Sequence, residues 1–278
     1  DLVICDMTVD VQNLLSRAER KQRLGRRQKL MSPLSIRLPL LDPDAFLNKT
    51  AAWVNPVFSR WGFCLWAVIV IAGIVLAGMH WTELTGNLAD RAFAPNNLRV
   101  MVLIYPVVKL FHELGHAYAV KRWGGEVHDI GVLFLVFMPV PYVDASASSA
   151  FRDKHKRMLV GAAGIMVELM LASLAMWVWT ETQPGLVRAI AFNTMLIGGL
   201  STLFFNGNPL LRFDGYYVFS DALEIPNLGT RSTQFLGYLT QRYLLRSKQA
   251  QRPLATPGES RWFVFYGISA FFYRLFIM

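Results

Sequence analysis

Cysteine and charged residues are both scarce in this chain of 278 residues. Its two cysteines, Cys5 and Cys64, form no C-x-x-C pair, so neither a disulfide framework nor a cysteine metal knuckle is indicated. Charged residues make up 17% of the chain, against roughly 25% in soluble domains. Hydrophobic residues make up 54%, and the mean hydropathy is +0.34. This composition excludes disordered and collagen-like chains, and it holds more apolar surface than one soluble core of this size could bury. A membrane protein is therefore indicated.

Several segments are long and apolar enough to cross a hydrocarbon core of about 30 Å, which needs roughly 20 helical residues. We expect four complete transmembrane helices and the start of a fifth, at 61–81, 100–120, 158–180, 189–211 and 262–278. The predicted fold is thus an all-α polytopic membrane protein.

The apolar segment 130–143 is too short to cross the membrane. It contains Pro139 and Pro141 and is rich in β-branched and aromatic residues. We therefore expect a re-entrant hairpin or loop, embedded in protein after the second helix.

Lysine and arginine are distributed unequally between alternate loops. Segments 1–60, 121–157 and 212–261 hold 10, 6 and 7 of them, whereas 82–99 and 181–188 hold 2 and 1. Because cationic residues concentrate on the cytoplasmic side, this predicts a cytoplasmic N-terminus. The net charge of +9 is then a signal of membrane sidedness, and we expect no nucleic-acid partner.

Two domains are expected from this topology. Residues 1–60 would form a basic cytosolic segment, and 61–278 a membrane-embedded domain with a cytosolic loop at 212–261. The basic run 17–29 fits a nucleic-acid patch or a cytosolic-face role at anionic lipid, and its position before a membrane domain favours the second.

Residues 112–116 read His-Glu-Leu-Gly-His, within the second expected span. On a helix, His112 and His116 project from the same face and can bind one zinc ion. Glu113 would lie beside a zinc-bound water, the nucleophile, and serve as its general base. The alternative is a pair of structural histidines, which would be costly to bury in a membrane span without a ligand.

A catalytic zinc needs a third protein ligand. The extended H-E-x-x-H-x-x-G-x-x-H pattern fails, because positions 119 and 122 are Ala and Arg. Glu126 follows in a loop, Glu168 lies in the third expected span, and Asp214 follows an Asn206-x-x-Pro helix break. The predicted topology brings residues 112–116 and the region of Asp214 to the same, cytoplasmic, side.

His112-Glu113-x-x-His116 on one span and Asn206-x-x-Pro-x-x-x-Phe-Asp214-Gly two spans later resemble the site-2 protease family of intramembrane zinc metalloproteases. The resemblance covers roughly residues 100–220. It implies that the two histidines and Asp214 bind zinc and that Glu113 is the general base. It also implies that 130–143 is the family's membrane-embedded hairpin, which presents a substrate strand near the metal.

One motif departs from that family. Its usual Ala-Gly-Pro-x-x-Asn sequence reads Ala163-Gly-Ile-Met-Val-Glu168 here. Asparagine can donate hydrogen bonds to a substrate or an oxyanion, whereas an ionised glutamate cannot. We expect Glu168 either to form an ion pair with Lys109 across facing helices or to act, with Asn206, as an accessory group at the metal site.

The leading prediction is an intramembrane zinc metalloendopeptidase that cleaves membrane-associated or exported peptides, or single-span membrane proteins. The segments 142–144 and 213–217 further resemble a subgroup of larger bacterial members with export-linked flanking domains. This resemblance implies a bacterial inner membrane and periplasmic adaptor or export partners. The chain, which starts at Asp1 and stops within an apolar stretch, is expected to be part of a longer protein. The alternative is a non-proteolytic membrane component of a peptide export or efflux system that retains the zinc-protease scaffold.

Overall fold

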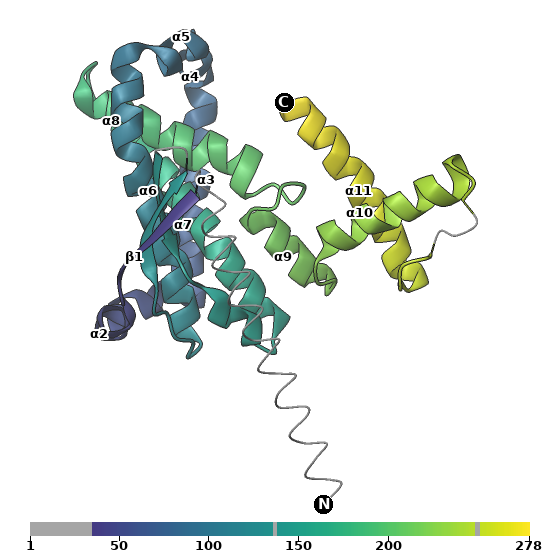
Figure 1. Ribbon diagram of the computed structural model, residues 1–278. Coiled ribbons are helices and arrows are strands. Elements are labelled where there is room, and N and C mark those ends of the chain that lie inside the picture. The colour runs from purple at the N-terminus through teal and green to yellow at the C-terminus, as the bar shows by residue number, and fades with distance from the viewer. Residues whose placement is uncertain (1–34, 136–137, 248–250) are drawn as a thin grey trace, which may run out of the picture.

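The computed structural model describes residues 35–135, 138–247 and 251–278 and is mostly helical (Figure 1). The basic run 17–29, and more than half of the expected segment 1–60, lie outside the described residues.

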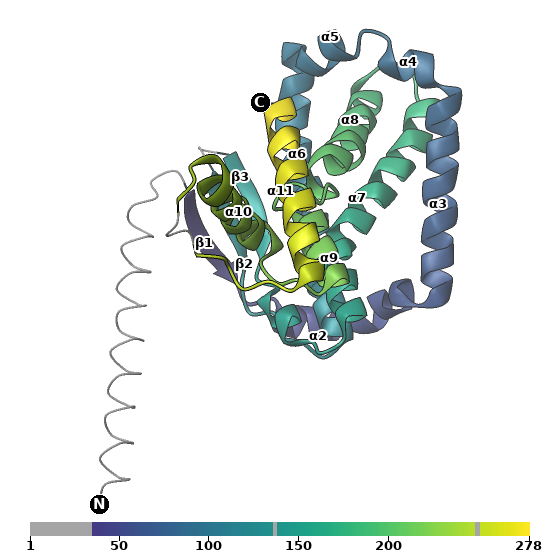
Figure 2. The same ribbon diagram turned by 90° about the vertical axis from the view of Figure 1, so that its right-hand side faces the viewer.

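Long helices form a bundle in which one helix is central (Figure 2). They are α3 (Arg60–Met79), α6 (Pro95–Arg122), α7 (Lys154–Glu181) and α8 (Leu186–Met195), the last continuing as the π-helical segment η3 (Leu196–Asn206). Helix α7 packs against α3, α6, α8 and η3. A glycine of η3 permits a close crossing with α7, because a Cβ atom at Gly198 would lie 2.6 Å from the backbone oxygen of Glu168.

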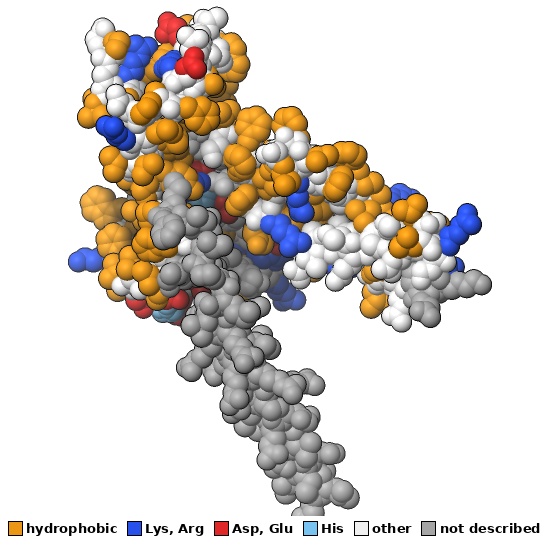
Figure 3. All heavy atoms as spheres, turned by 45° about the horizontal axis from the view of Figure 1, so that its top comes forward, with side chains coloured by type: hydrophobic (Ala, Val, Ile, Leu, Met, Phe, Trp, Pro, Cys, Tyr) orange, Lys and Arg blue, Asp and Glu red, His pale blue; other side chains and the backbone are white. Residues whose placement is uncertain are grey.

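Three helices in the described part of the chain are long and apolar enough to cross a membrane. They are α3, α7 and the continuous helix Leu186–Asn206. Ser59 caps the start of helix α3, since its hydroxyl accepts a hydrogen bond from the amide of Gly62. The helix exposes most of its apolar side chains, such as Leu65 and Val68. Hydrophobic side chains also cover much of the surface visible in Figure 3. Such a surface suits a lipid solvent.

Three strands form an antiparallel sheet in the order β1-β2-β3, so the fold is mostly helical, as expected, but not all-α. They are β1 (Ser35–Leu41), β2 (Ile130–Leu135) and β3 (Met138–Val143). The segment 130–143 is a β-hairpin, with Ile130 opposite Val143. Its β-branched residues favour strands. A lone hairpin is only marginally stable, and the pairing of β1 with β2 adds a third strand that stabilises it.

The prolines of β3 lie on the outer edge of this sheet. The amide of Asp144 donates to the carbonyl of Asp129, 2.9 Å away, beside the β2 strand. Because backbone groups alternate in direction along a strand, those of Pro139, Pro141 and Val143 point away from β2. Proline there costs the sheet no hydrogen bond. The strand contacts helix α6, which carries the His-Glu-x-x-His motif.

The stretch 212–261, expected to be a loop, contains helices. They are α9 (Asp214–Leu223), α10 (Leu228–Leu239) and the short π-helical η4 (Thr240–Leu244), followed by α11 (Pro257–Ile277). Helices α10 and α11 pack together as an arm that projects from the bundle (Figure 1). Leu228 and Phe235 are apolar at helical spacing and are buried against Phe263 and Tyr266 of α11.

Short elements connect the larger ones. They are α2 (Asp44–Val54), η1 (Asn55–Phe58), α4 (Trp81–Thr85), α5 (Leu88–Phe93) and η2 (Ser146–Ala150).

Candidate metal centre

Two histidines of α6 meet an aspartate at the start of α9. Nε2 of His112 lies 2.9 Å from Oδ2 of Asp214, and Nε2 of His116 lies 3.5 Å from the same oxygen. The two Nε2 atoms are 3.0 Å apart. Both imidazoles are buried, whereas the carboxylate of Asp214 is partly exposed. The three groups could hold one metal ion, since their ligand atoms all lie within 4.8 Å of one another.

The chain between η3 and α9 turns sharply to bring Asp214 to this place. The side chain of Asn208 accepts a hydrogen bond from the amide of Leu210 at 2.8 Å, which stabilises the turn. Gly215 approaches the backbone of Gly207 so closely that a Cβ atom would lie 2.4 Å from the Gly207 oxygen. The Pro-containing break therefore lets α9 start at Asp214, beside the imidazoles.

His116 is oriented by the backbone of α7. Its Nδ1 lies 2.7 Å from the carbonyl oxygen of Val160. Because a carbonyl only accepts hydrogen bonds, Nδ1 donates to it, and Nε2, on the side of Asp214, is the nitrogen that can bind a metal ion. This is the arrangement of a metal-binding histidine.

His112 has a different neighbour on its far side. Its buried Nδ1 lies 3.1 Å from Oε1 of Glu168, outside the direction of a good hydrogen bond, and makes no hydrogen bond to any other described group. The two groups form an ion pair only when the imidazole is protonated. A buried ring nitrogen without a hydrogen bond is rare and calls for a functional explanation.

Glu168 is completely buried at the centre of a polar cluster. Nζ of Lys109 lies 2.5 Å from its Oε1, and Nδ2 of Asn206 lies 3.0 Å from its Oε2, which also accepts a short hydrogen bond from the hydroxyl of Thr202. Both roles considered for Glu168 from sequence are therefore compatible, because it pairs with Lys109 and also contacts His112.

Glu113 lies between the histidines and the sheet. Its Oε2 accepts a hydrogen bond of 3.1 Å from the amide of Val143, the last residue of β3. It also interacts electrostatically with His112, His116 and Asp214. The hydrogen bond thus ties the side chain of Glu113 to the end of β3.

The residues present fit a zinc ion. Two imidazole nitrogens and one carboxylate oxygen are a donor set that zinc uses in catalytic sites. Gly164 of α7 supplies the space beside them, because a Cβ atom there would lie 2.5 Å from Nε2 of His112 and 2.6 Å from Nε2 of His116. The glycine lets α7 approach without displacing the imidazoles.

The structure brings together six residues singled out from sequence and separates a seventh. His112, Glu113, His116, Glu168, Asn206 and Asp214 all belong to this region. Glu126 does not, because it is exposed and pairs with His128 at 3.2 Å.

Sequence reasoning missed Thr202 and Gly164. Thr202 lies one helical turn before Asn206, so their shared face was a usable signal. Gly164 belongs to the Ala163-Gly164 pair of the noted motif, but its contact with the imidazoles depends on how α6 and α7 cross.

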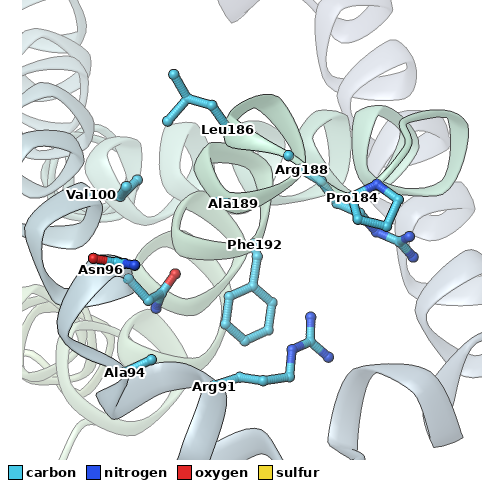
Figure 4. Close-up of a pocket in the computed structure, with 11 residues that line it drawn as sticks. Arg91, Ala94, Asn96, Val100, Pro184, Leu186, Arg188, Ala189 and Phe192 are labelled. Atoms are coloured by element: carbon cyan, nitrogen blue, oxygen red, sulfur yellow. The ribbon is translucent and has the colours of Figure 1, made fainter.

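A separate cavity of about 460 Å³ lies between the start of α6 and the start of α8. Arg91, Arg188 and Phe192 line it, and the guanidinium of Arg91 lies over the ring of Phe192 (Figure 4). No candidate metal ligand lines this cavity, so it is not the metal centre.

No family model and no solved structure matches this chain. A relative from Bacillus subtilis (strain 168), named "Putative peptide zinc metalloprotease protein YydH", is 26% identical to it over 168 residues. The match covers 59% of this chain and 62% of the relative, so the chain spans less than two thirds of that protein. In general terms, this likeness supports a zinc protease, and the three apolar helices support a membrane protein.

Proposed function

We propose that this chain is the membrane domain of an intramembrane zinc metalloendopeptidase of the site-2 protease type. The observation that carries the proposal is the meeting of His112, His116 and Asp214, from elements about 100 residues apart, beside Glu113. The name of the Bacillus subtilis relative agrees with a zinc-dependent peptidase.

Each side chain has a role in this reaction. Nε2 of His112, Nε2 of His116 and Oδ2 of Asp214 would hold the zinc ion. When bound, zinc supplies Lewis-acid activation of water and of the peptide carbonyl. The carboxylate of Glu113 would take the proton of the attacking water and later deliver it to the leaving amine nitrogen. The amide of Val143 keeps this carboxylate from turning away.

The substrate would be an extended stretch of a membrane-associated or exported peptide, or of a single-span membrane protein. A helical peptide must unwind first, because its amides are internally hydrogen-bonded. The outer edge of β3 ends at Val143, which contacts Glu113, so a peptide lying along the sheet would reach the general base. Edge strands commonly receive extended peptides, and along this edge β3 offers its backbone carbonyls, because Pro139 and Pro141 have no N–H and the amide of Val143 binds Glu113.

The membrane arrangement is part of the proposal. It has four crossings and a fifth helix, with the N-terminus in the cytoplasm of a bacterium and the metal centre toward the cytoplasmic side. The unequal distribution of lysine and arginine between loops supports it. Periplasmic adaptor or export proteins would be the partners of a longer chain.

Metal analysis and cleavage assays on variants test this function. Purified wild-type protein and Glu113→Gln should both hold one zinc per chain, and Glu113→Gln should lose peptide cleavage. His116→Ala and Asp214→Ala should lose both zinc and cleavage, whereas the exposed His155→Ala is a control that should keep both. Stoichiometric zinc in His116→Ala or Asp214→Ala would contradict the ligand assignment.

A second candidate is a non-proteolytic component of a peptide export system. It is favoured by Glu168, which replaces the usual asparagine and is fully engaged by Lys109, Thr202 and Asn206. No donor at that position is free for a substrate. If the full-length Glu113→Gln protein still supports export of its peptide, this function holds; loss of export favours the peptidase.

A further inference from the structure

We propose that Glu168 is a positioning residue that orients His112 for metal binding, and that Lys109, Thr202 and Asn206 fix its carboxylate in place. The inference rests on the proposed zinc site and deepens it. In metal centres the ring nitrogen that does not bind the metal usually donates to a carboxylate or a carbonyl, which sets the tautomer and the ring orientation.

The two histidines differ in the acceptor that lies beside Nδ1. His116 has a backbone carbonyl, that of Val160, at 2.7 Å from Nδ1. His112 has the side-chain oxygen of Glu168 at 3.1 Å and no hydrogen bond from Nδ1 to any other described group. A buried N–H without an acceptor destabilises the arrangement. A small rotation of the ring toward Oε1 would remove this cost and keep Nε2 facing Asp214.

The carboxylate of Glu168 is held from two directions. Its Oε1 contacts Nζ of Lys109, on the turn of α6 that precedes His112. Its Oε2 accepts hydrogen bonds from Thr202 and Asn206 of η3. With both oxygens engaged by different elements, the carboxylate cannot rotate without breaking contacts. It therefore presents Oε1 to His112 at a fixed position.

A purely structural ion pair between α6 and α7 is the competing explanation. In that case the pair would support folding, and metal binding would be indifferent to it. The positioning role instead predicts that loss of the acceptor beside Nδ1 weakens metal binding even in a folded protein. The two explanations therefore differ in metal affinity and in the electronic spectrum of a bound ion.

The variants must remove Glu168 without leaving a buried charge. Glu168→Met alone would leave Lys109 unpaired and could unfold the chain. The double variant Lys109→Met/Glu168→Met removes both charges at similar volume. The double variant Lys109→Met/Glu168→Gln keeps a neutral acceptor beside His112. Ser173→Ala, at another buried polar residue of α7, is the matched control.

The experiment measures zinc affinity by chelator competition, and the visible spectrum of the cobalt-loaded protein, for the full chain in detergent. We expect Lys109→Met/Glu168→Met to bind zinc about 10–100-fold more weakly with an altered cobalt spectrum. Lys109→Met/Glu168→Gln should recover part of the affinity, and Ser173→Ala should match wild type.

The outcomes separate this inference from the proposed function. Wild-type affinity and spectrum in the Met/Met variant, together with loss of metal in His116→Ala, would overturn the positioning role and leave the zinc site intact. Equal losses in the Met/Met and Gln variants, with both correctly folded, would overturn the role of an acceptor. A wild-type protein that binds neither zinc nor cobalt would overturn both proposals.

Discussion

Two histidines in this region each lie close to two carboxylates. His112 lies within helix α6, and His128 follows the end of that helix. His112 lies 2.9 Å from Asp214 and 3.1 Å from Glu168. His128 lies 3.1 Å from Asp42 and 3.2 Å from Glu126. The distances are nearly the same, but the side chain of His112 is 5% exposed and that of His128 is 60% exposed.

This difference teaches that contact distance does not determine what a charged cluster does. Water screens the exposed cluster, so its ion pairs contribute little to stability. Around His112 water is excluded, so a charged group without a partner is energetically costly, and each charged group has a defined partner. A third pair, between Asp44 and Lys121 at the end of α6, lies between these extremes, with side chains 19% and 6% exposed. Energetic effects should therefore decrease along this series.

Breaking the buried ion pair between Lys109 and Glu168 should reduce the stability of the protein most. Lys109→Ala leaves the carboxylate of Glu168 buried without its cation, and we expect the free energy of unfolding to fall by about 3–5 kcal/mol. Denaturant unfolding in detergent measures this change. Lys154→Ala, which removes an exposed pair with Glu224, is the matched control and should change stability by less than about 1 kcal/mol. Equal effects of the two variants would refute the role of burial.

Filling the space beside the imidazoles should disrupt metal binding. The methyl group of Gly164→Ala would lie 2.5 Å from Nε2 of His112, so at least one imidazole must move. We expect zinc affinity to fall on the order of 10–100-fold, the range seen when the support of metal ligands is lost. Gly199→Ala, whose methyl would meet only Ala172 at 3.7 Å, should bind zinc like wild type. Chelator competition measures both.

Breaking the partly buried ion pair between Asp44 and Lys121 should reduce stability by an intermediate amount. Asp44 pairs with Nζ of Lys121 at 2.5 Å and accepts the amide of Val127 at 3.0 Å, which ties α2 to the end of α6. Asp44→Ala leaves both donors without this partner, so we expect a loss of about 1–3 kcal/mol in unfolding free energy. In a double-mutant cycle with Lys121→Met, a coupling energy near zero would show that the pair contributes nothing.

Sequence alone indicates the parts of this molecule that depend on local patterns. Apolar runs predict helices over the regions of α3 and α7, and four-residue spacing predicts that His112 and His116 share a face. The meeting of these residues with Asp214 followed from a family resemblance and from counting membrane crossings. Local patterns are strong here because lipid requires long, continuous apolar helices.

The remaining features depend on contacts between distant residues. Strand β1 pairs Ser35 with Leu135, a non-local pairing that no short pattern marks. The role of Thr202 toward Glu168 follows from how η3 crosses α7. Sequence left open whether Glu168 pairs with Lys109 or serves the metal site, because both roles need the same buried position. Only the packed helices show that one oxygen of Glu168 lies beside both Lys109 and His112.

The exposed cluster should give the smallest effect, visible in its titration more than in stability. Hydrogen bonds to Asp42 and then Glu126 raise the pKa of His128 above its ordinary value. Because this pKa is raised, the stabilisation that protonated His128 contributes to the fold is complete below about pH 6.5. It is lost as the pH rises through the pKa of His128 in the folded protein. In an NMR titration of the histidine ring, Asp42→Asn should lower the pKa of His128, and high salt should lower it in wild type. Unfolding midpoints should barely change, because solvent already screens the pair. An unaltered pKa of His128 in Asp42→Asn, or a loss of stability as large as that of Lys109→Ala, would remove the distinction between the two histidines of this region.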